Sequence, residues 1–121
     1  MTCGKIVLLC LALLPLWGRE ARAHAWPDHA SPAVGSTIHA PPTEVRIWFT
    51  QELEPAFSTI RVLDGSGRQV DRNDPKVDAT DRTLIKVSLP PLQPGVYKAI
   101  WRVLSVDTHV TEGEFTFRVA P

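Results

Sequence analysis

Apolar and polar residues alternate in several short runs along this chain, a pattern that predicts half-buried β-strands. Within each run the apolar residues stand two positions apart, so their side chains face the same side of a sheet. From residue 24 onward, no window of useful length has the period of an amphipathic helix. The runs cover residues 45–49, 60–62, 85–89, 97–103 and 115–119.

Turn and loop residues separate these runs. The segment Asp64-Gly65-Ser66-Gly67 predicts a turn because its glycines tolerate positive φ angles, and residues 68–70 are expected to return as a short strand. Residues 90–95 are rich in proline and end the strand before them. We expect residues 71–83 to form a polar surface loop. Residues 24–42, rich in Pro, Ala, Ser and His, are expected to form an extended arm.

Several short strands with Gly and Pro between them predict one all-β domain, either a β-sandwich or a small Greek-key barrel. The chain has 121 residues, which fits a single domain with one self-supporting hydrophobic core. We find no internal repeat and no composition change that would mark a second domain.

Residues 1–23 have the pattern of a secretory signal peptide. Lys5 supplies a positive start, residues 6–17 are apolar, and Ala21-Arg22-Ala23 offers the small residues that a signal peptidase recognises. The apolar run is shorter than the roughly 20 residues that span a bilayer, which argues against the alternative of an uncleaved anchor. We therefore expect cleavage after Ala23, export to the periplasm, and a mature domain at residues 24–121.

The predicted mature domain keeps 10 Lys+Arg and 12 Asp+Glu, a formal net charge of −2 with histidine neutral. No basic patch remains that could follow a phosphate backbone, so nucleic acid is excluded as a partner. Both cysteines, Cys3 and Cys10, and the only methionine, Met1, precede the cleavage site. The mature domain therefore has no disulfide and no sulfur ligand, and any metal must be held by nitrogen and oxygen.

The strongest candidate metal ligands are His24, Asp107 and His109. Cleavage would make His24 the N-terminal residue, which can chelate a metal through its α-amine and its imidazole Nδ1. The reference pKa of an α-amine is about 7.7–8.0, so a strong Lewis acid displaces its proton at neutral pH. In an extended segment, Asp107 and His109 share one side because they stand two residues apart. Three nitrogens and one carboxylate oxygen in a tetragonal plane suit Cu(II).

Each of these signals also has a simpler interpretation. An N-terminal histidine is often only the residue left by cleavage, and an Asp-x-His sequence in a β protein is usually part of a solvent-facing turn. Spacing alone does not bring residue 24 close to residue 107. His29 could reach a shared metal but is expected to face solvent, and His39 has no ligand-like neighbour. Trp26 is a candidate to shield a site near the N-terminus.

The motifs of this chain together resemble those of the CopC family of exported copper-binding proteins, and the resemblance covers nearly all of the mature domain. The C-terminal block is long, ordered and the most specific part. The matching motifs are His24-Ala25, Ser31-Pro32-Ala33-x-Gly35, Val45-Arg46-Ile47-x-Phe49, Phe57-Ser58, Gly95-x-Tyr97-x-x-x-Trp101-Arg102-Val103-x-Ser105-x-Asp107-x-His109 and Gly113-x-Phe115-x-Phe117-x-Val119.

The resemblance implies a Greek-key β-barrel or sandwich of about seven strands, described as cupredoxin-like or immunoglobulin-like. It also implies one Cu(II) ion per chain, bound by His24, Asp107 and His109. The mature domain lacks the methionines of family members with a second, Cu(I) site, so it resembles the Cu(II)-only branch. The chain departs from the family's pattern at two places. Gln51 stands where relatives often carry glutamate, which bears on the charge and the fourth or fifth ligand of the site, and Trp26-Pro27 is a further local difference.

The function implied is that of a monomeric copper carrier or buffer in copper homeostasis or resistance, not an enzyme. Its partners would be the copper ion and an inner-membrane copper transporter. Two alternatives remain. Lytic polysaccharide monooxygenases also use an N-terminal histidine brace, so an oxidative copper enzyme is one of them. The other is a secreted β-sandwich interaction module that binds no metal.

Overall fold

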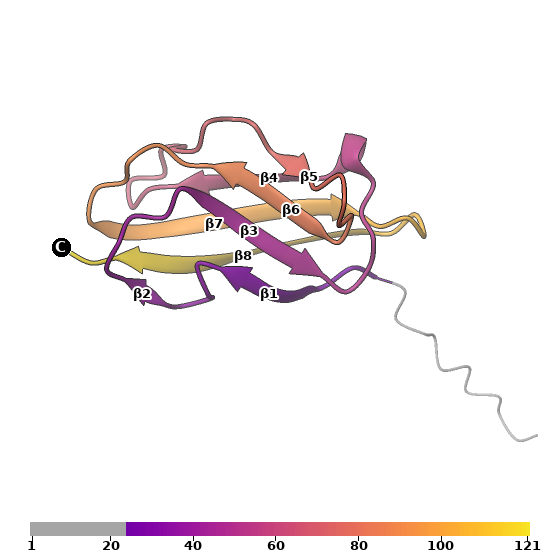
Figure 1. Ribbon diagram of the computed structural model, residues 1–121, viewed down its shortest axis with the longest axis horizontal. Helices are drawn as coiled ribbons and strands as arrows, with labels where there is room; N and C mark the ends of the chain where they lie inside the picture. The colour runs from indigo at the N-terminus through magenta and orange to yellow at the C-terminus, as the bar shows by residue number, and fades with distance from the viewer. Residues whose placement is uncertain (1–23) are drawn as a thin grey trace, which may run out of the picture.

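The protein forms a sandwich of two four-stranded β-sheets (Figure 1). The computed structural model describes residues 24–121, and the predicted signal peptide, residues 1–23, lies outside them. The described residues contain one short 3-10 helix, η1 (Pro55–Phe57), and none of their helices is long and apolar enough to cross a membrane. The strands are β1 (Pro27–Ser31), β2 (Thr37–Ile38), β3 (Glu44–Phe49), β4 (Thr59–Leu63), β5 (Lys76–Val77), β6 (Leu84–Ser88), β7 (Gly95–Leu104) and β8 (Val110–Val119). The predicted all-β class is confirmed, with eight strands where the resemblance implied about seven.

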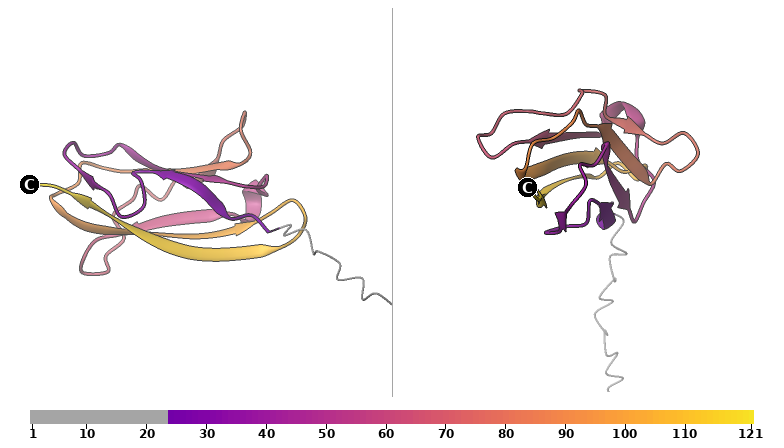
Figure 2. Two further views of the ribbon diagram at one scale, coloured as in Figure 1. Left: turned by 90° about the horizontal axis from the view of Figure 1, so that it is seen from below. Right: turned by 60° about the vertical axis from the view of Figure 1, so that its left-hand side comes forward.

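The two sheets have the strand orders β1-β3-β6-β5 and β2-β8-β7-β4. Paired strands are antiparallel except β2 and β8, which run parallel. β7 and β8 pair along their whole length of 10 residues each. The described chain begins at one end of the long axis and the C-terminus lies at the other (Figure 1, Figure 2). The turn between β7 and β8 therefore lies at the end where the described chain begins.

Alternate residues of the strands form the core between the sheets. On β7, Tyr97, Ala99, Trp101 and Val103 are all buried, which confirms the predicted inward face of this strand. The predicted apolar positions of β3, β4, β6 and β8 are buried as well. Burying a large apolar side chain contributes roughly 1.5–3 kcal/mol relative to leaving it exposed. This core has to stabilise the described domain without a disulfide.

Part of the arm predicted at residues 24–42 is paired, which corrects that prediction. β1 pairs with β3, and β2 pairs with the last residues of β8. Neither short strand has a buried apolar face, so no hydrophobic alternation marked it in the sequence. Both are edge strands, and their conformation depends on pairing with a neighbour more than on their own composition.

The polar loop predicted at residues 71–83 contains β5, which pairs with β6 and buries Val77. A strand of two residues is too short to show a period. The short strand predicted at residues 68–70 is instead a single bridge between Leu63 and Gln69. The carboxylate of Asp71 accepts a hydrogen bond from the backbone N–H of Val62 at 2.7 Å. This side-chain bond satisfies a donor of β4 that a longer strand at residues 68–70 would otherwise pair.

Candidate metal centre

The structure brings His24, Asp107 and His109 to the same end of the sandwich. His24 precedes β1, while Asp107 and His109 lie in the turn between β7 and β8. The rings of His24 and His109 are in edge-to-face contact, with centroids 4.4 Å apart and planes at 87°. The Nδ1 atom of His109 lies 3.4 Å from Oδ1 of Asp107. The sequence spacing could not show that residue 24 lies near residues 107–109, and the fold brings these segments together.

The three side chains do not form a complete metal-coordination geometry. Within residues 24–121, no group of three or more His, Cys, Asp or Glu side chains is arranged to hold a metal ion as it stands. The edge-to-face contact between the two imidazoles fills the space between them.

Backbone and side-chain hydrogen bonds hold the segment that carries His24. The hydroxyl of Thr111, near the start of β8, donates to the carbonyl oxygen of Ala25 at 2.7 Å. Thr50 follows β3, and its backbone N–H donates to the carbonyl oxygen of Trp26 at 2.9 Å. The N–H of Trp26 in turn donates to the hydroxyl of Thr50 at 3.1 Å. These bonds fix the segment on both sides of the sandwich, beside the β7–β8 turn.

The β7–β8 turn is closed by its own backbone. The N–H of Ser105 donates to the carbonyl oxygen of His109 at 3.0 Å. The N–H of Thr108 donates to the carbonyl oxygen of Ser105 at 2.9 Å. Thr108 has a φ of 73°, a conformation that is rare for a β-branched residue and costs about 1–3 kcal/mol. The N–H of Val106 donates to the backbone carbonyl oxygen of Glu52 at 3.0 Å, which ties the turn to the segment after β3. The turn thus holds Asp107 and His109 in a defined place.

The carboxylate of Asp107 has one engaged and one free oxygen. Oδ1 accepts the hydroxyl of Ser105 and faces His109. The hydrogen bond from Ser105 holds the pKa of Asp107 below its ordinary value, against the opposing effect of desolvation, and His109 adds to the lowering. Asp107 is therefore ionised at neutral pH and available as an anionic ligand.

Two buried side-chain atoms in the described part of the chain have no hydrogen-bond partner there, namely Nδ1 of His24 and Oδ2 of Asp107. A buried polar atom left without a partner typically costs about 1–3 kcal/mol. Both atoms are ordinary metal ligands, and both belong to residues that the sequence singled out. These residues therefore fit a bound cation, because it would satisfy both atoms at once.

The other two histidines lie elsewhere. His29 on β1 stacks on the indole of Trp48 on β3, with centroids 4.3 Å apart, and its Nδ1 lies 2.7 Å from a carboxylate oxygen of Asp28. His39 follows β2, which pairs with the C-terminal end of β8, whereas His109 precedes the start of β8. A 10-residue strand spans about 30 Å, so His39 lies at the far end of the molecule from His109.

Two hydroxyl residues at this end were not identified as site residues from the sequence. Ser105 continues the inward-facing positions of β7, and Thr111 begins those of β8. A polar residue at a position where the alternation predicts an apolar one is the signal that could have found them. Both are buried. Gln51 is partly buried beside the paired residue Thr50, and Trp26 is half-exposed.

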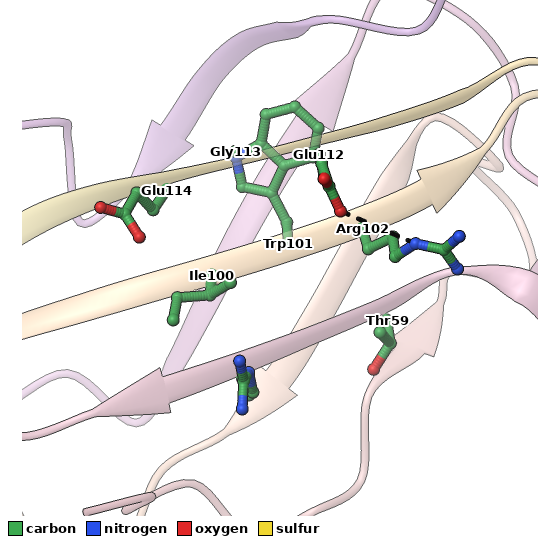
Figure 3. Close-up of a pocket in the computed structure, with 8 residues that line it drawn as sticks. Thr59, Ile100, Trp101, Arg102, Glu112, Gly113 and Glu114 are labelled. Atoms are coloured by element: carbon green, nitrogen blue, oxygen red, sulfur yellow. Dashed lines mark ion pairs between the residues drawn. The ribbon is translucent and has the colours of Figure 1, made fainter. Parts of the chain in front are cut away.

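A surface depression on the outward face of the β2-β8-β7-β4 sheet, the face turned away from the core, is separate from the candidate metal site (Figure 3). It is lined by exposed charged residues around Ile100 and contains no histidine. Arg102 and Glu112 form an exposed ion pair of 3.7 Å across it, which contributes little because water screens both charges. The depression offers neither buried polar atoms nor a metal-ligand set.

Comparisons with known proteins agree on one family. Residues 28–120 match the CopC domain family. The copper transport protein CutJ of Bacillus subtilis (strain 168) is 30% identical over 115 residues; the match covers 94% of this chain but only 21% of CutJ. Copper resistance protein C of Pseudomonas syringae pv. tomato is 30% identical over 105 residues, covering 82% of each protein. The crystal structure of CopC from Methylosinus trichosporium OB3b is similar with a TM-score of 0.76 at 35% identity, over 81% of this chain and 95% of that chain.

Proposed function

The chain belongs to the CopC domain family, and we propose that it binds one Cu(II) ion through His24, Asp107 and His109 as an exported copper carrier or buffer. The membership confirms the resemblance found in the sequence. The names of CutJ and of copper resistance protein C refer to copper transport and copper resistance, and neither name states a reaction. Copper as the bound ion and carriage as the role are proposals for this chain.

One observation carries the metal assignment. Nδ1 of His24 and Oδ2 of Asp107 are buried without a hydrogen-bond partner in the described residues, and the ring of His109 touches that of His24. Buried polar atoms are almost always paired in folded proteins. A cation bound by both atoms explains why these two are left unpaired at the same end of the domain.

The chemistry of the donors favours Cu(II) over other metals. Cleavage after Ala23 would add the α-amine of His24 to two imidazoles and one carboxylate. This set of three nitrogens and one oxygen suits a tetragonal Cu(II) centre, and Cu(II) heads the affinity order of the divalent first-row metals. Residues 24–121 contain no Cys and no Met, so a soft Cu(I) site cannot form from them.

The role of carrier or buffer follows from the number of ligands. Four protein donors fill a tetragonal plane, whereas catalytic metal sites normally keep a position open for substrate. We propose that residues 1–23 direct export to the periplasm and are then removed. The copper would pass from there to a transporter in the inner membrane.

The test combines maturation with metal binding. Protein recovered from the periplasm is analysed by N-terminal mass determination and then titrated with Cu(II) under electron spin resonance. We expect a chain that begins at His24, one Cu(II) per chain, and a spectrum with nitrogen hyperfine splitting. A correctly processed chain that binds no Cu(II), or binds it without nitrogen coupling, would refute the proposal.

A further inference from the structure

The buried polar residues of this protein gather at one end. Within residues 24–121 the buried polar or charged side chains are Ser58, Ser105 and Thr111, all three of them hydroxyl residues. Ser58 bonds with the backbone of Leu104 at the end of β7, and Thr111 bonds with Ala25 beside His24. The rest of the core is apolar. Buried hydroxyls require hydrogen bonds to offset their desolvation, so their position at this end calls for a specific explanation.

Ser105 is the most deeply buried of the three, with no exposed surface. Its hydroxyl donates to Oδ1 of Asp107 and lies 3.1 Å from the carbonyl oxygen of His109. Its backbone N–H separately donates to that same carbonyl oxygen at 3.0 Å. The turn therefore has a backbone bond between the same two residues, which loss of the hydroxyl would leave in place. Its distinctive partner is the carboxylate.

We propose that Ser105 is a positioning residue that fixes the orientation of the Asp107 carboxylate, so that one of its oxygens stays available to the metal. By engaging Oδ1, the hydroxyl leaves Oδ2 as the buried oxygen of this carboxylate that has no hydrogen-bond partner in the described residues. This inference rests on the proposed copper function and deepens it.

The physical basis is that a free aspartate rotates about its side-chain torsions, so its carboxylate has no fixed direction. A fixed second bond removes that freedom before the metal arrives, so less ordering accompanies binding. Hydrogen-bonded partners of metal ligands commonly change metal affinity by about 10–100-fold when they are removed.

The test uses the mature protein beginning at His24, with Cu(II) as the probe. Ser105→Ala removes the hydroxyl but keeps both backbone bonds of the turn. We expect a loss of Cu(II) affinity of about tenfold and a changed Cu(II) spin-resonance spectrum, because the carboxylate no longer holds one orientation. Ser58→Ala is the matched control: it removes another buried hydroxyl at this end, one whose hydrogen bonds go to the backbone of Leu104 and not to a proposed ligand. The control should lower the unfolding temperature without changing the spectrum.

A double-mutant cycle separates positioning from general destabilisation. If Ser105 acts through Asp107, then Ser105→Ala should have no further effect on Cu(II) affinity in an Asp107→Ala background. An equal loss in both backgrounds would overturn the inference, as would an unchanged affinity and spectrum in Ser105→Ala. In either case, nitrogen-coupled Cu(II) in the unmodified mature protein would leave the proposed function standing. If that protein binds no Cu(II), both proposals fail.

Discussion

His24 and His109 lie with their rings edge to face, their centroids 4.4 Å apart, although they stand near opposite ends of the described chain. The contact depends on two separate structural features. The bond from Thr111 to Ala25 holds the N-terminal segment against β8, and the turn closed by Ser105 presents His109. No local sequence feature could produce this contact, because the bond from Thr111 to Ala25 joins segments that are far apart in the chain.

A free amine at His24 should be essential for strong copper binding. We compare the chain that begins at His24 with the same chain carrying one additional glycine before it. Cu(II) affinity should fall by about 10²-fold or more in the extended chain, because the second donor of a chelate binds as an intramolecular ligand. Competition titration against a Cu(II) chelator measures the difference. Equal affinities would exclude the amine as a ligand.

Replacing His109 should change the copper centre, whereas replacing His39 should not. His109→Ala removes one nitrogen from the proposed set, so the nitrogen hyperfine pattern of the Cu(II) spin-resonance spectrum should simplify. His39 lies about 30 Å away along β8 and serves as the matched control. Identical spectra for His109→Ala and His39→Ala would show that the ligand assignment is wrong.

Thr111→Val should loosen the segment that carries His24. The substitution keeps the shape of the side chain but leaves the buried carbonyl oxygen of Ala25 without its donor. We expect the free energy of unfolding to fall by about 1–3 kcal/mol, measured by urea denaturation. Thr116→Val, at an exposed position on the same strand, should change it by no more than about 0.5 kcal/mol. Similar losses in both variants would contradict a specific role for the Thr111 hydroxyl.

Gly113 provides the space for the indole of Trp101. A Cβ atom at residue 113 would lie 2.5 Å from Cζ2 of Trp101, which is far inside van der Waals contact. Gly113→Ala should therefore destabilise the fold by about 1–3 kcal/mol and shift the tryptophan fluorescence. At Gly65 the nearest atom to an added Cβ is 3.8 Å away, so Gly65→Ala should cause no loss of stability. A stable Gly113→Ala protein with unchanged fluorescence would contradict this packing.

Asp78 should contribute to stability in a pH-dependent way. Hydrogen bonds from Thr80, then from Lys86 and the backbone of the same loop, hold the pKa of its carboxylate well below the ordinary value of 3.8. A lowered pKa in the folded state means that the contribution is fully present above pH 3.8 and is lost as the pH falls below it.

The measurement compares the wild type with Asp78→Asn by urea denaturation across this pH range. The wild type should be more stable at pH 7, and its advantage should shrink steadily below about pH 4. The difference between the two proteins isolates Asp78 from other acidic groups that titrate in the same range. An advantage that stays constant down to the lowest pH would show that the ionised carboxylate is not the cause.

Much of the fold could be predicted because the inward faces of the long strands repeat every second residue. The alternation located β3, β4, β6, β7 and β8, and the structure buries the residues that it marked. The same period predicted that Asp107 and His109 share one side of an extended segment, whereas the structure places them in a turn with Thr108 at a φ of 73°. These features are local, since a strand shows its period within its own residues.

The short strands β1, β2 and β5 could not be predicted, because none of them has a buried face long enough to repeat. Their place depends on a partner strand and its register. Ser105 and Thr111 were missed as site residues for a related reason. A hydroxyl at an inward position is informative only when its acceptor is known, and the acceptor of Thr111 lies on a distant segment.

The sequence alone therefore determined the all-β class, the longer strands, and three residues whose chemistry suits Cu(II). Only the tertiary structure decided that His24 meets His109, that His39 lies at the far end, and that one oxygen of Asp107 remains free. The physical reason is the same for each of these features. Strand period and ligand chemistry can be recognised from neighbouring residues, whereas contacts between distant segments form only when the two sheets pack against each other.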